Sequence, residues 1–154
     1  IMKKHKILQM EFSHSKTVYD LQLKNKNELG NNIWMSWEID NILNGGNKFC
    51  KVSMNNESLT GFCIFSVSND FLELYSIFVD PNYRNQGIAK KFLKSAKNYC
   101  KKNFLKKILL EVNEKNKFAI SLYKKHDFIF FGKRKNYYME DGKFYDAWLM
   151  RFNV

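Results

Sequence analysis

One segment constrains the fold of this chain more than any other. A strand-like apolar run ending at Val79 is followed by Asp80-Pro81, a polar loop and Gly87, and then by a helix that reaches about Asn103. Apolar residues on that helix recur every three or four positions, which is the spacing of one helical face. The segment therefore predicts a strand, a loop and a helix in succession, with the loop opening directly onto a helix N-terminus.

The helix after Gly87 has two different faces. Its apolar face consists of Ile88, Phe92, Ala96 and Tyr99. Its opposite face carries Lys90, Lys94, Lys97 and Lys101. We interpret the apolar face as core and the lysine face as a solvent-exposed surface.

The remaining pattern predicts further strands and helices. Strands are expected at residues 6–12, 49–54, 59–67, 71–79, 107–113, 128–133 and 143–152. Helices are expected at residues 17–29, 35–43 and 116–125. Short polar turns join the three strands between residues 49 and 79, which favours an antiparallel meander. No linker-like stretch divides the 154 residues, so we expect a single α/β (α+β) domain over residues 1–154.

Charge suggests an affinity for polyanions but not a sequence-specific nucleic-acid reader. The net charge is +11, yet the chain has 23 lysines and only 3 arginines. Arginine is the side chain that most often reads bases, so we expect at most non-specific contact with nucleic acid. No apolar run approaches the length of about 20 residues that spans a bilayer, and no signal peptide is recognisable. The sequence therefore predicts a cytoplasmic protein without a membrane partner.

The cysteines and histidines do not have the spacing of a metal site. Cys50, Cys63 and Cys100 are far apart and lie in apolar or helical stretches. They are expected to be buried free thiols. The three histidines are scattered as well, so no metal is predicted.

The loop before Gly87 has the features of an anion site. The first N–H groups of a helix have no intrahelical acceptor, and the helix dipole favours negative charge there. Glycine lets the backbone approach a ligand closely because it has no side chain. A diphosphate is the kind of ligand that such a loop accommodates.

The same segment resembles the acetyl-CoA loop of the GNAT superfamily of N-acetyltransferases, R/Q-x-x-G-x-G/A. Arg84, Gly87 and Ala89 match it, after a strand ending in V-D-P. The resemblance implies the GNAT fold, a mixed and mostly antiparallel sheet flanked by helices, with acetyl-CoA as co-substrate. It implies that acetyl-CoA is bound by Ile77, Phe78, Val79, Arg84, Asn85, Gln86, Gly87, Ile88, Ala89 and Lys90.

A second segment, residues 110–123, narrows the resemblance. It is similar to L-E-V-x-x-x-N-x-x-A-I-x-L-Y and continues with Phe128, Gly132, Arg134 and Tyr137-Tyr138, then Asp146-Ala147 and Met150. This set resembles the bacterial ribosomal-protein-alanine N-acetyltransferases, which implies a protein N-terminus as acceptor. Three positions depart from the pattern, namely Asn113, Asp127 and Tyr145. Asp127 replaces a glycine, which aspartate tolerates because it can adopt a left-handed conformation.

The resemblance also implies the catalytic residues. In this superfamily the amine attacks the thioester directly, so the cysteines need no role. Glu111 lies between apolar neighbours on a strand and is the expected base, while a surface position alone would also explain it. Tyr123 is the expected acid, either donating as the thiolate forms or having a lowered pKa. Asn116 lies two helical turns before Tyr123, where it can cap the helix and also meet the cofactor.

Further roles are implied for one backbone group and two side chains. The N–H of Val79 is expected to receive the thioester oxygen. Tyr137 and Tyr138 are expected to wall the peptide channel, although adjacent residues of a strand point to opposite sides unless the segment is a loop.

Other functions stay open at this point. The acceptor could be a small amine such as a polyamine or aminoglycoside, or a lysine side chain. The chain could also be a basic RNA-binding module or a sensor of acyl-CoA without activity.

Overall fold

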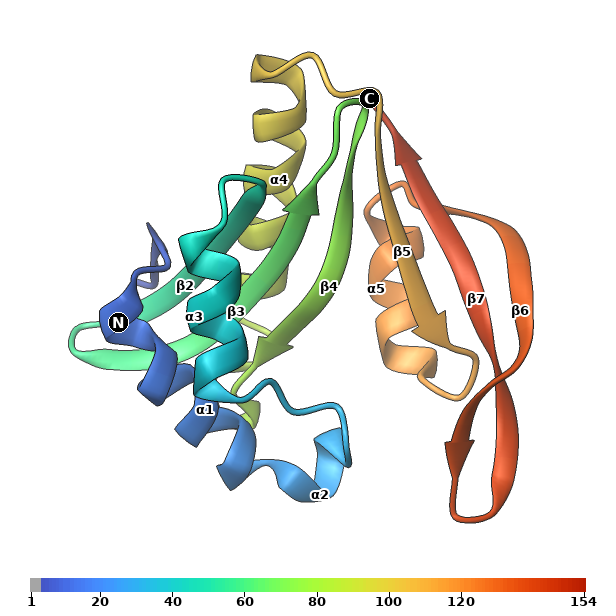
Figure 1. The fold of residues 1–154 in the computed structure, drawn as a ribbon, viewed down its shortest axis with the longest axis horizontal. Helices are drawn as coiled ribbons and strands as arrows, with labels where there is room; N and C mark the ends of the chain where they lie inside the picture. The colour runs from blue at the N-terminus through green and yellow to red at the C-terminus, as the bar shows by residue number, and fades with distance from the viewer. Residues whose placement is uncertain (1–3) are drawn as a thin grey trace. The chain divides into compact units, whose positions relative to one another are not determined.

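The computed structural model describes residues 4–154, and Figure 1 labels its elements. The strands are β1 (Lys6–Gln9), β2 (Lys48–Asn55), β3 (Ser58–Val67), β4 (Phe71–Val79), β5 (Lys107–Asn113), β6 (Ile129–Glu140) and β7 (Lys143–Asn153). The helices are α1 (Ser15–Lys24), α2 (Lys26–Leu29), α3 (Ser36–Asn44), α4 (Ile88–Lys102) and α5 (Lys117–Lys125), with 3-10 turns η1 (Phe12–His14) and η2 (Pro81–Tyr83). The strands are hydrogen-bonded in the order β1-β2-β3-β4-β5-β7-β6.

The chain divides into two compact units. The first unit comprises residues up to 66 together with 75–92, and the second comprises 67–74 and 93–154. Both β4 and α4 contribute residues to each unit. Each unit is described by itself below.

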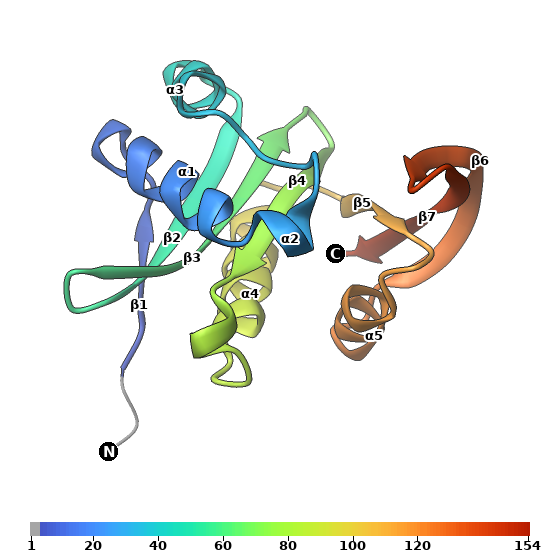
Figure 2. The same cartoon turned by 90° about the horizontal axis from the view of Figure 1, so that it is seen from below.

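The first unit consists of strands with helices on both faces. Strands β1, β2 and β3 pair antiparallel, and β4 follows β3 in the hydrogen-bonded order. Helices α1 and α3 cover one face, as Figure 2 shows. Their buried residues Val18, Leu21, Ile39 and Leu43 pack with Val52, Phe62, Ile64 and Phe78 of the strands. A Cβ at Gly61 would lie 2.8 Å from the Phe78 carbonyl, so glycine is needed where β3 approaches β4.

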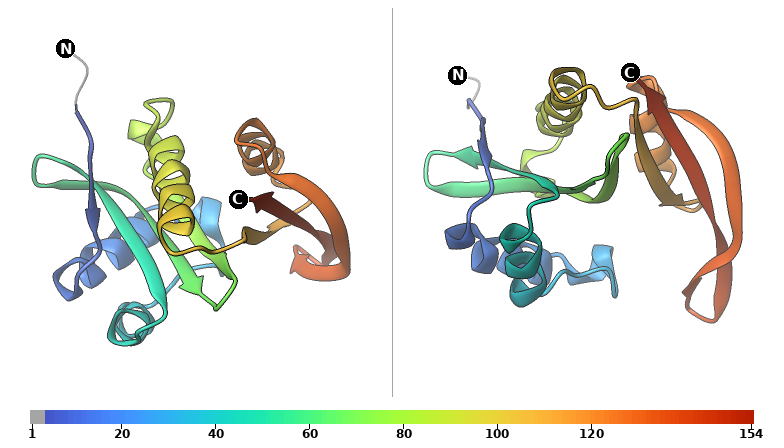
Figure 3. Two further views of the ribbon diagram at one scale, coloured as in Figure 1. Left: turned by 90° about the horizontal axis from the view of Figure 1, so that it is seen from above. Right: turned by 45° about the horizontal axis from the view of Figure 1, so that its top comes forward.

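The second unit is a sheet with a long terminal hairpin. The start of β4 pairs parallel with β5 over Phe71–Leu74 and Lys107–Leu110, and β7 pairs antiparallel with both β5 and β6. Figure 3 shows the β6–β7 hairpin with α5 on one side of it. The side chains of β5 alternate in burial, with Ile108, Leu110 and Val112 in the core.

Three predicted elements differ from the structure, two of them for a local reason. Strand β1 ends at Gln9 instead of residue 12, because the His14 ring accepts the Glu11 N–H and turns the chain into η1. The helix predicted at 17–29 is two helices, because Asn25 leaves the helical conformation and its side chain bonds the Leu21 carbonyl. The strand predicted at 128–133 continues to Glu140.

Helix α4 confirms the predicted apolar face, with one exception on the lysine face. Ile88, Phe92 and Ala96 are buried. Lys97 is not simply solvated, because its Nζ donates to the His126 carbonyl at 2.7 Å and lies 4.1 Å from the centre of the Phe152 ring. Within residues 4–154, no helix combines the length and apolarity needed to cross a membrane.

Candidate active site

The loop between β4 and α4 begins at a firmly held aspartate. The Asp80 N–H donates to the Thr60 carbonyl at 2.9 Å, and Asp80 Oδ1 accepts the Asn82 N–H at 2.9 Å. Pro81 starts η2, where its fixed φ and missing N–H are compatible with a helical turn. These contacts fix the point at which the chain leaves β4.

Arg84, the first residue of the loop motif, has its side chain engaged within the protein. Its Nε donates to the Val79 carbonyl at 3.1 Å, and its Nη2 pairs with Glu28 Oε1 at 2.7 Å. The guanidinium also lies 5.4 Å from the centre of the Phe78 ring. The side chain therefore braces the loop against β4 and α2.

The segment from Asn85 to Gly87 has an unusual backbone. Asn85 and Gly87 have φ angles of 61° and 79°, in the left-handed region that glycine enters without strain. Apart from Gly87 and its two neighbours in the chain, no heavy atom of residues 4–154 lies within 4 Å of the place that a Cβ on Gly87 would occupy. Ile88 then begins α4, whose first N–H groups have no intrahelical acceptor. The open backbone and the N–H groups of a helix N-terminus fit a diphosphate.

The other residues predicted to contact the cofactor lie on both sides of this loop. Ile77, Phe78 and Val79 end β4, while Ile88, Ala89 and Lys90 form the first turn of α4. Phe78 and Ile88 have buried side chains. At these two positions only backbone groups are available to a ligand.

Gln86 connects the loop to the interior. Its Oε1 lies 2.8 Å from Nε2 of His5, which is 4% exposed. His5 Nδ1 lies 3.2 Å from Thr60 Oγ1, which in turn lies 2.9 Å from Ser53 Oγ. The Lys91 ammonium donates to the His5 carbonyl at 3.2 Å. His5 could not be singled out from motif spacing, because its contact with Gln86 joins residues 81 positions apart.

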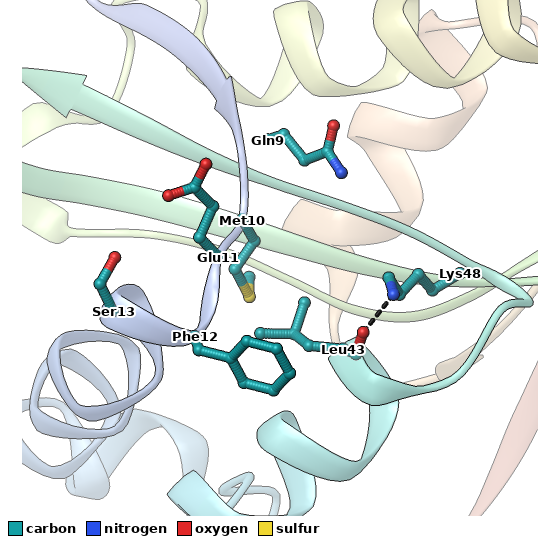
Figure 4. A pocket seen from close by; sticks show the side chains of 7 residues that line it. All are labelled: Gln9, Met10, Glu11, Phe12, Ser13, Leu43 and Lys48. Carbon is teal, nitrogen blue, oxygen red and sulfur yellow. Dashed lines mark hydrogen bonds between the residues drawn. The ribbon is translucent and has the colours of Figure 1, made fainter.

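A surface hollow in the first unit does not involve any predicted site residue. Its volume is about 430 Å³, and Figure 4 shows the seven lining residues, Gln9, Met10, Glu11, Phe12, Ser13, Leu43 and Lys48. The Lys48 ammonium is engaged by the Leu43 and Gly45 carbonyls at the end of α3. The ammonium that lines the hollow is therefore already engaged within the protein, and the predicted motif residues lie elsewhere.

In the second unit, Glu111 lies half-buried on β5 and is paired with arginine. Arg134 Nε donates to Glu111 Oε1 at 2.7 Å. Glu111 faces Leu149 in the β5–β7 ladder, and Arg134 and Tyr138 face Ala147 and Tyr145 in the β6–β7 ladder. Tyr145, Ala147 and Leu149 are alternate residues of β7, so their side chains lie on one face. Their partners Tyr138, Arg134 and Glu111 therefore share that face of the sheet.

Tyr123 lies on α5 and is almost completely buried, with 5% of its surface exposed. Burial raises the pKa of its hydroxyl well above the usual value, and the nearby Tyr138 adds to the shift. This direction argues against a lowered pKa, so donation while the thiolate forms is the alternative that remains. Asn116 caps the same helix, since its Oδ1 accepts the Ala119 N–H at 3.1 Å. The capping interpretation of Asn116 is confirmed, and its contact with a cofactor stays a prediction.

The two adjacent tyrosines of β6 do not point to opposite sides. Their ring centres lie 5.0 Å apart, with the ring planes at 87°. A bulge between Arg134 and Tyr138 interrupts the alternation of the strand. Burial raises the pKa of Tyr138 to about 12, and the Glu111 carboxylate adds to the shift.

The three cysteines are free and buried, as predicted. Burial raises the pKa of Cys50 to about 11 and that of Cys100 to about 11, and it raises the pKa of Cys63 further. A thiol with a raised pKa is a poor nucleophile at neutral pH, because the thiolate is the reactive form.

Comparison with known proteins connects these features. Residues 8–128 match the acetyltransferase (GNAT) family. The chain belongs to the GNAT acetyltransferase family. As a GNAT protein it is an N-acetyltransferase. One relative is a protein of Bacillus subtilis that is named provisionally as a ribosomal protein bS18-alanine N-acetyltransferase. That relative is 35% identical over 92 residues, which cover 60% of this chain and only 60% of the relative.

Other relatives agree over more of their length. The ribosomal protein bS18-alanine N-acetyltransferase of Haemophilus ducreyi is 32% identical over 117 residues, 74% of this chain and 81% of the relative. The crystal structure of the ribosomal-protein-S18-alanine N-acetyltransferase from Escherichia coli has a TM-score of 0.86 at 24% identity, covering 98% and 94% of the two chains. Arabidopsis thaliana NAA60 in complex with acetyl-CoA has a TM-score of 0.82 at 18% identity, covering 98% and 99%. These structures confirm the GNAT fold, a mixed and mostly antiparallel sheet with flanking helices.

The GNAT resemblance pointed to Asp127, for which a left-handed conformation was expected, and to Arg134 and Asp146, for which it predicted no contact. Asp127 has a φ of 70°, which confirms that it takes the left-handed conformation expected where the family has glycine. Arg134 holds Glu111, and Asp146 accepts a backbone N–H of the bulge at 2.9 Å. Contacts between neighbouring strands of this kind depend on register, which motif spacing does not specify.

Proposed function

We propose that this chain transfers the acetyl group of acetyl-CoA to the α-amine at a protein N-terminus, with a ribosomal protein as the first candidate. The observation that carries the proposal is the alignment, over most of both chains, with a relative named for acetylating the alanine of a ribosomal protein. An acceptor on the ribosome would place the reaction in the cytoplasm. The residue roles below are inferred from the motifs and from the local geometry.

The loop from Arg84 to Lys90 is proposed to bind the diphosphate of acetyl-CoA. Support comes from the left-handed backbone at Asn85 and Gly87, the open space beside Gly87 and the start of α4, where the first N–H groups of a helix have no intrahelical acceptor. Lys90 is exposed and adds positive charge next to this position. No metal ion is needed, because backbone dipoles and lysine supply the positive potential.

Glu111 is proposed to accept the proton that the amine loses when its nitrogen attacks the thioester carbon. Arg134 engages Glu111 through Oε1, and Oε2 is the oxygen proposed to meet the amine or a bridging water. A model α-amine has a pKa of about 7.7–8.0, against about 10.4 for lysine. Roughly a tenth of an α-amine is neutral at pH 7, so one carboxylate is a sufficient base for it and a poor one for lysine.

The Val79 N–H and the Tyr123 hydroxyl are proposed to complete the reaction. Val79 donates a hydrogen bond to the carbonyl oxygen while negative charge collects there. Tyr123 donates its proton to the sulfur as the carbon–sulfur bond breaks, and the proton that Glu111 took from the amine is released to solvent, from which the phenolate of Tyr123 is reprotonated. Because burial keeps Tyr123 protonated, it is a hydrogen-bond donor throughout the working pH range. The amide and the free thiol of coenzyme A are then the products.

An acetylation assay tests the proposal. Acetyl-CoA is supplied with three groups of acceptors: peptides with a free N-terminal alanine, N-terminally blocked peptides with one lysine, and polyamines. Mass spectrometry identifies the acetylated atom. We expect the free α-amine to be preferred. Preference for the lysine peptide or for a polyamine would overturn the N-terminal proposal and leave the acetyltransferase assignment in place.

A further inference from the structure

The β6–β7 hairpin contains an irregularity that the proposed mechanism does not use. Arg134 pairs with Ala147 and Tyr138 pairs with Tyr145, so three residues of β6 lie opposite the single residue Asp146 of β7. A regular antiparallel ladder opposes one residue with one. Two extra residues are therefore inserted into β6, and Asn136 within the bulge has a φ of 51°.

The bulge changes the direction of Tyr137. Two extra residues leave the alternation of Arg134 and Tyr138 intact, so both stay on the face that carries Glu111. Tyr137 would point to the opposite face of a regular strand, yet its ring lies 5.0 Å from that of Tyr138 and 5.8 Å from the Arg134 guanidinium. The bulge thus brings two phenol rings together beside the proposed base.

A single carboxylate holds the bulge. The Asn136 N–H, which lies outside the regular ladder, donates to Asp146 Oδ1 at 2.9 Å. The backbone of Asp146 is fixed in turn by Glu114: the Asp146 N–H donates to Glu114 Oε1 at 2.8 Å, and the Glu114 N–H donates to the Asp146 carbonyl at 2.9 Å. A carboxylate is a stronger acceptor for a backbone N–H than a neutral group is. Asp146 is therefore anchored to the end of β5 while its side chain holds β6.

We propose that Asp146 is a positioning residue for the acceptor, because its carboxylate holds the bulge that places Tyr137 beside Tyr138. The inference rests on the proposed function and specifies its acceptor side. Two perpendicular phenol rings form an apolar wall with hydroxyl groups at its edge, which suits an extended peptide. The backbone of such a peptide offers both apolar and hydrogen-bonding surface behind the amine. A free diamine has no comparable surface.

The positioning role of Asp146 requires a side-chain oxygen that accepts the Asn136 N–H. Two substitutions at Asp146, one that keeps such an oxygen and one that removes it, should therefore have different effects. Asp146→Asn keeps a carbonyl oxygen that can accept the Asn136 N–H, and Asp146→Leu has a similar volume without an acceptor. We expect Asp146→Leu to raise the KM for the acceptor peptide on the order of tenfold, with the KM for acetyl-CoA unchanged. Asp146→Asn should stay within about threefold of the wild type. Asp70→Leu is the matched control, because Asp70 pairs with Lys106 in the same unit and does not touch the bulge.

Hydrogen exchange at the Asn136 amide provides a readout that needs no substrate. Exchange should accelerate in Asp146→Leu and remain slow in Asp146→Asn and Asp70→Leu. The proposal is overturned if Asp146→Leu leaves the acceptor KM unchanged, or if both KM values rise together with a lowered Tm. Equal losses in the two Asp146 variants would also overturn it.

The same measurements distinguish this inference from the proposed function. If the wild-type enzyme acetylates lysine or polyamine instead of an N-terminus, the proposed function fails on the wild type alone. The variants are then compared on the amine that the wild type does use. A change restricted to the KM of that amine supports the positioning role, and an unchanged KM removes it.

Discussion

The loop of residues 80–90 and the bulged hairpin of residues 134–146 are both irregular segments, yet they are held in different ways. The loop is held from the interior: Gln86 contacts a buried histidine, and Asp80 bonds the backbone of a central strand. The hairpin is held near the surface, by the Arg134–Glu111 pair and the Asn136–Asp146 hydrogen bond, both of which are exposed.

This difference suggests a division of roles. A buried polar network loses much when one member is removed, since the remaining groups are cut off from water. An exposed hydrogen bond or ion pair contributes little to stability, because water replaces the missing partner. We therefore expect substitutions around the loop to affect folding and cofactor binding together. Substitutions in the hairpin should affect turnover or acceptor use with little change in stability.

The largest expected effect is at Glu111, the β5 residue that pairs with Arg134 of the hairpin. Glu111→Gln should lower kcat by about 10²–10⁴-fold at neutral pH, the usual span for a general base. Cofactor affinity and Tm should remain close to wild type, because the Arg134 contact is exposed and an amide oxygen can still accept it. Steady-state kinetics and calorimetric titration with acetyl-CoA measure the two quantities.

Glu114→Gln is the control for this substitution. Glu114 lies three residues later and accepts the Asp146 N–H, a contact that glutamine can also make. Its kcat should stay within a few-fold of wild type. If Glu111→Gln retains comparable activity at every pH, Glu111 is structural and the base is another group.

The loop side is tested at Gly87. Gly87→Gln places a side chain in a left-handed conformation, at a strain of about 1–2 kcal/mol, and fills the open space where the diphosphate is proposed to lie. We expect acetyl-CoA affinity to fall by about 10- to 100-fold. Gly142 has a φ of 73° and equally open surroundings, so Gly142→Gln carries a similar strain without the ligand effect. Equal losses of affinity in the two variants would remove the loop assignment.

Much of the fold and of the candidate site could be predicted from the sequence. The features that could not be predicted all depend on contacts or strand register that local sequence does not specify. The strand–loop–helix segment and the alternating burial of β5 follow from periodicity, because each depends on residues close in the chain. The anchor of the loop could not be predicted from the sequence, because His5 meets Gln86 only after segments distant in the chain have come together. The side of Tyr137 could not be read either, since a two-residue bulge reverses the direction that strand alternation predicts.

Substitution of His5, the buried residue that anchors the loop through Gln86, should have a smaller effect than the substitutions at Glu111 and Gly87. His5→Leu removes the partner of Gln86 and one partner of Thr60, and we expect the free energy of unfolding to fall by about 1–3 kcal/mol. Gln86→Leu should weaken acetyl-CoA binding with less change in stability, because Gln86 is largely exposed. The two substitutions should be non-additive in acetyl-CoA affinity, since both break one contact. Additive effects would mean that His5 does not act through the loop.

The smallest expected effect is on the alkaline stability of the hairpin. Burial raises the pKa of Tyr138 from an ordinary value of about 10 to about 12 in the folded protein. Between these values the unfolded chain releases the phenol proton while the folded chain retains it, so the folded state binds more protons there and stability falls as pH rises. The contribution of Tyr138 is therefore complete below about pH 10 and is lost as the pH approaches 12. Tyr138→Phe should make the decline in unfolding free energy between these pH values shallower, as measured by urea titrations. The control is the same comparison at pH 7. There the Tyr138 phenol of the wild type is protonated in both the folded and the unfolded state, so any difference between variant and wild type does not come from titration. An identical alkaline decline in the variant and the wild type would show that Tyr138 is accessible to water, and the bulge would then not shelter its ring.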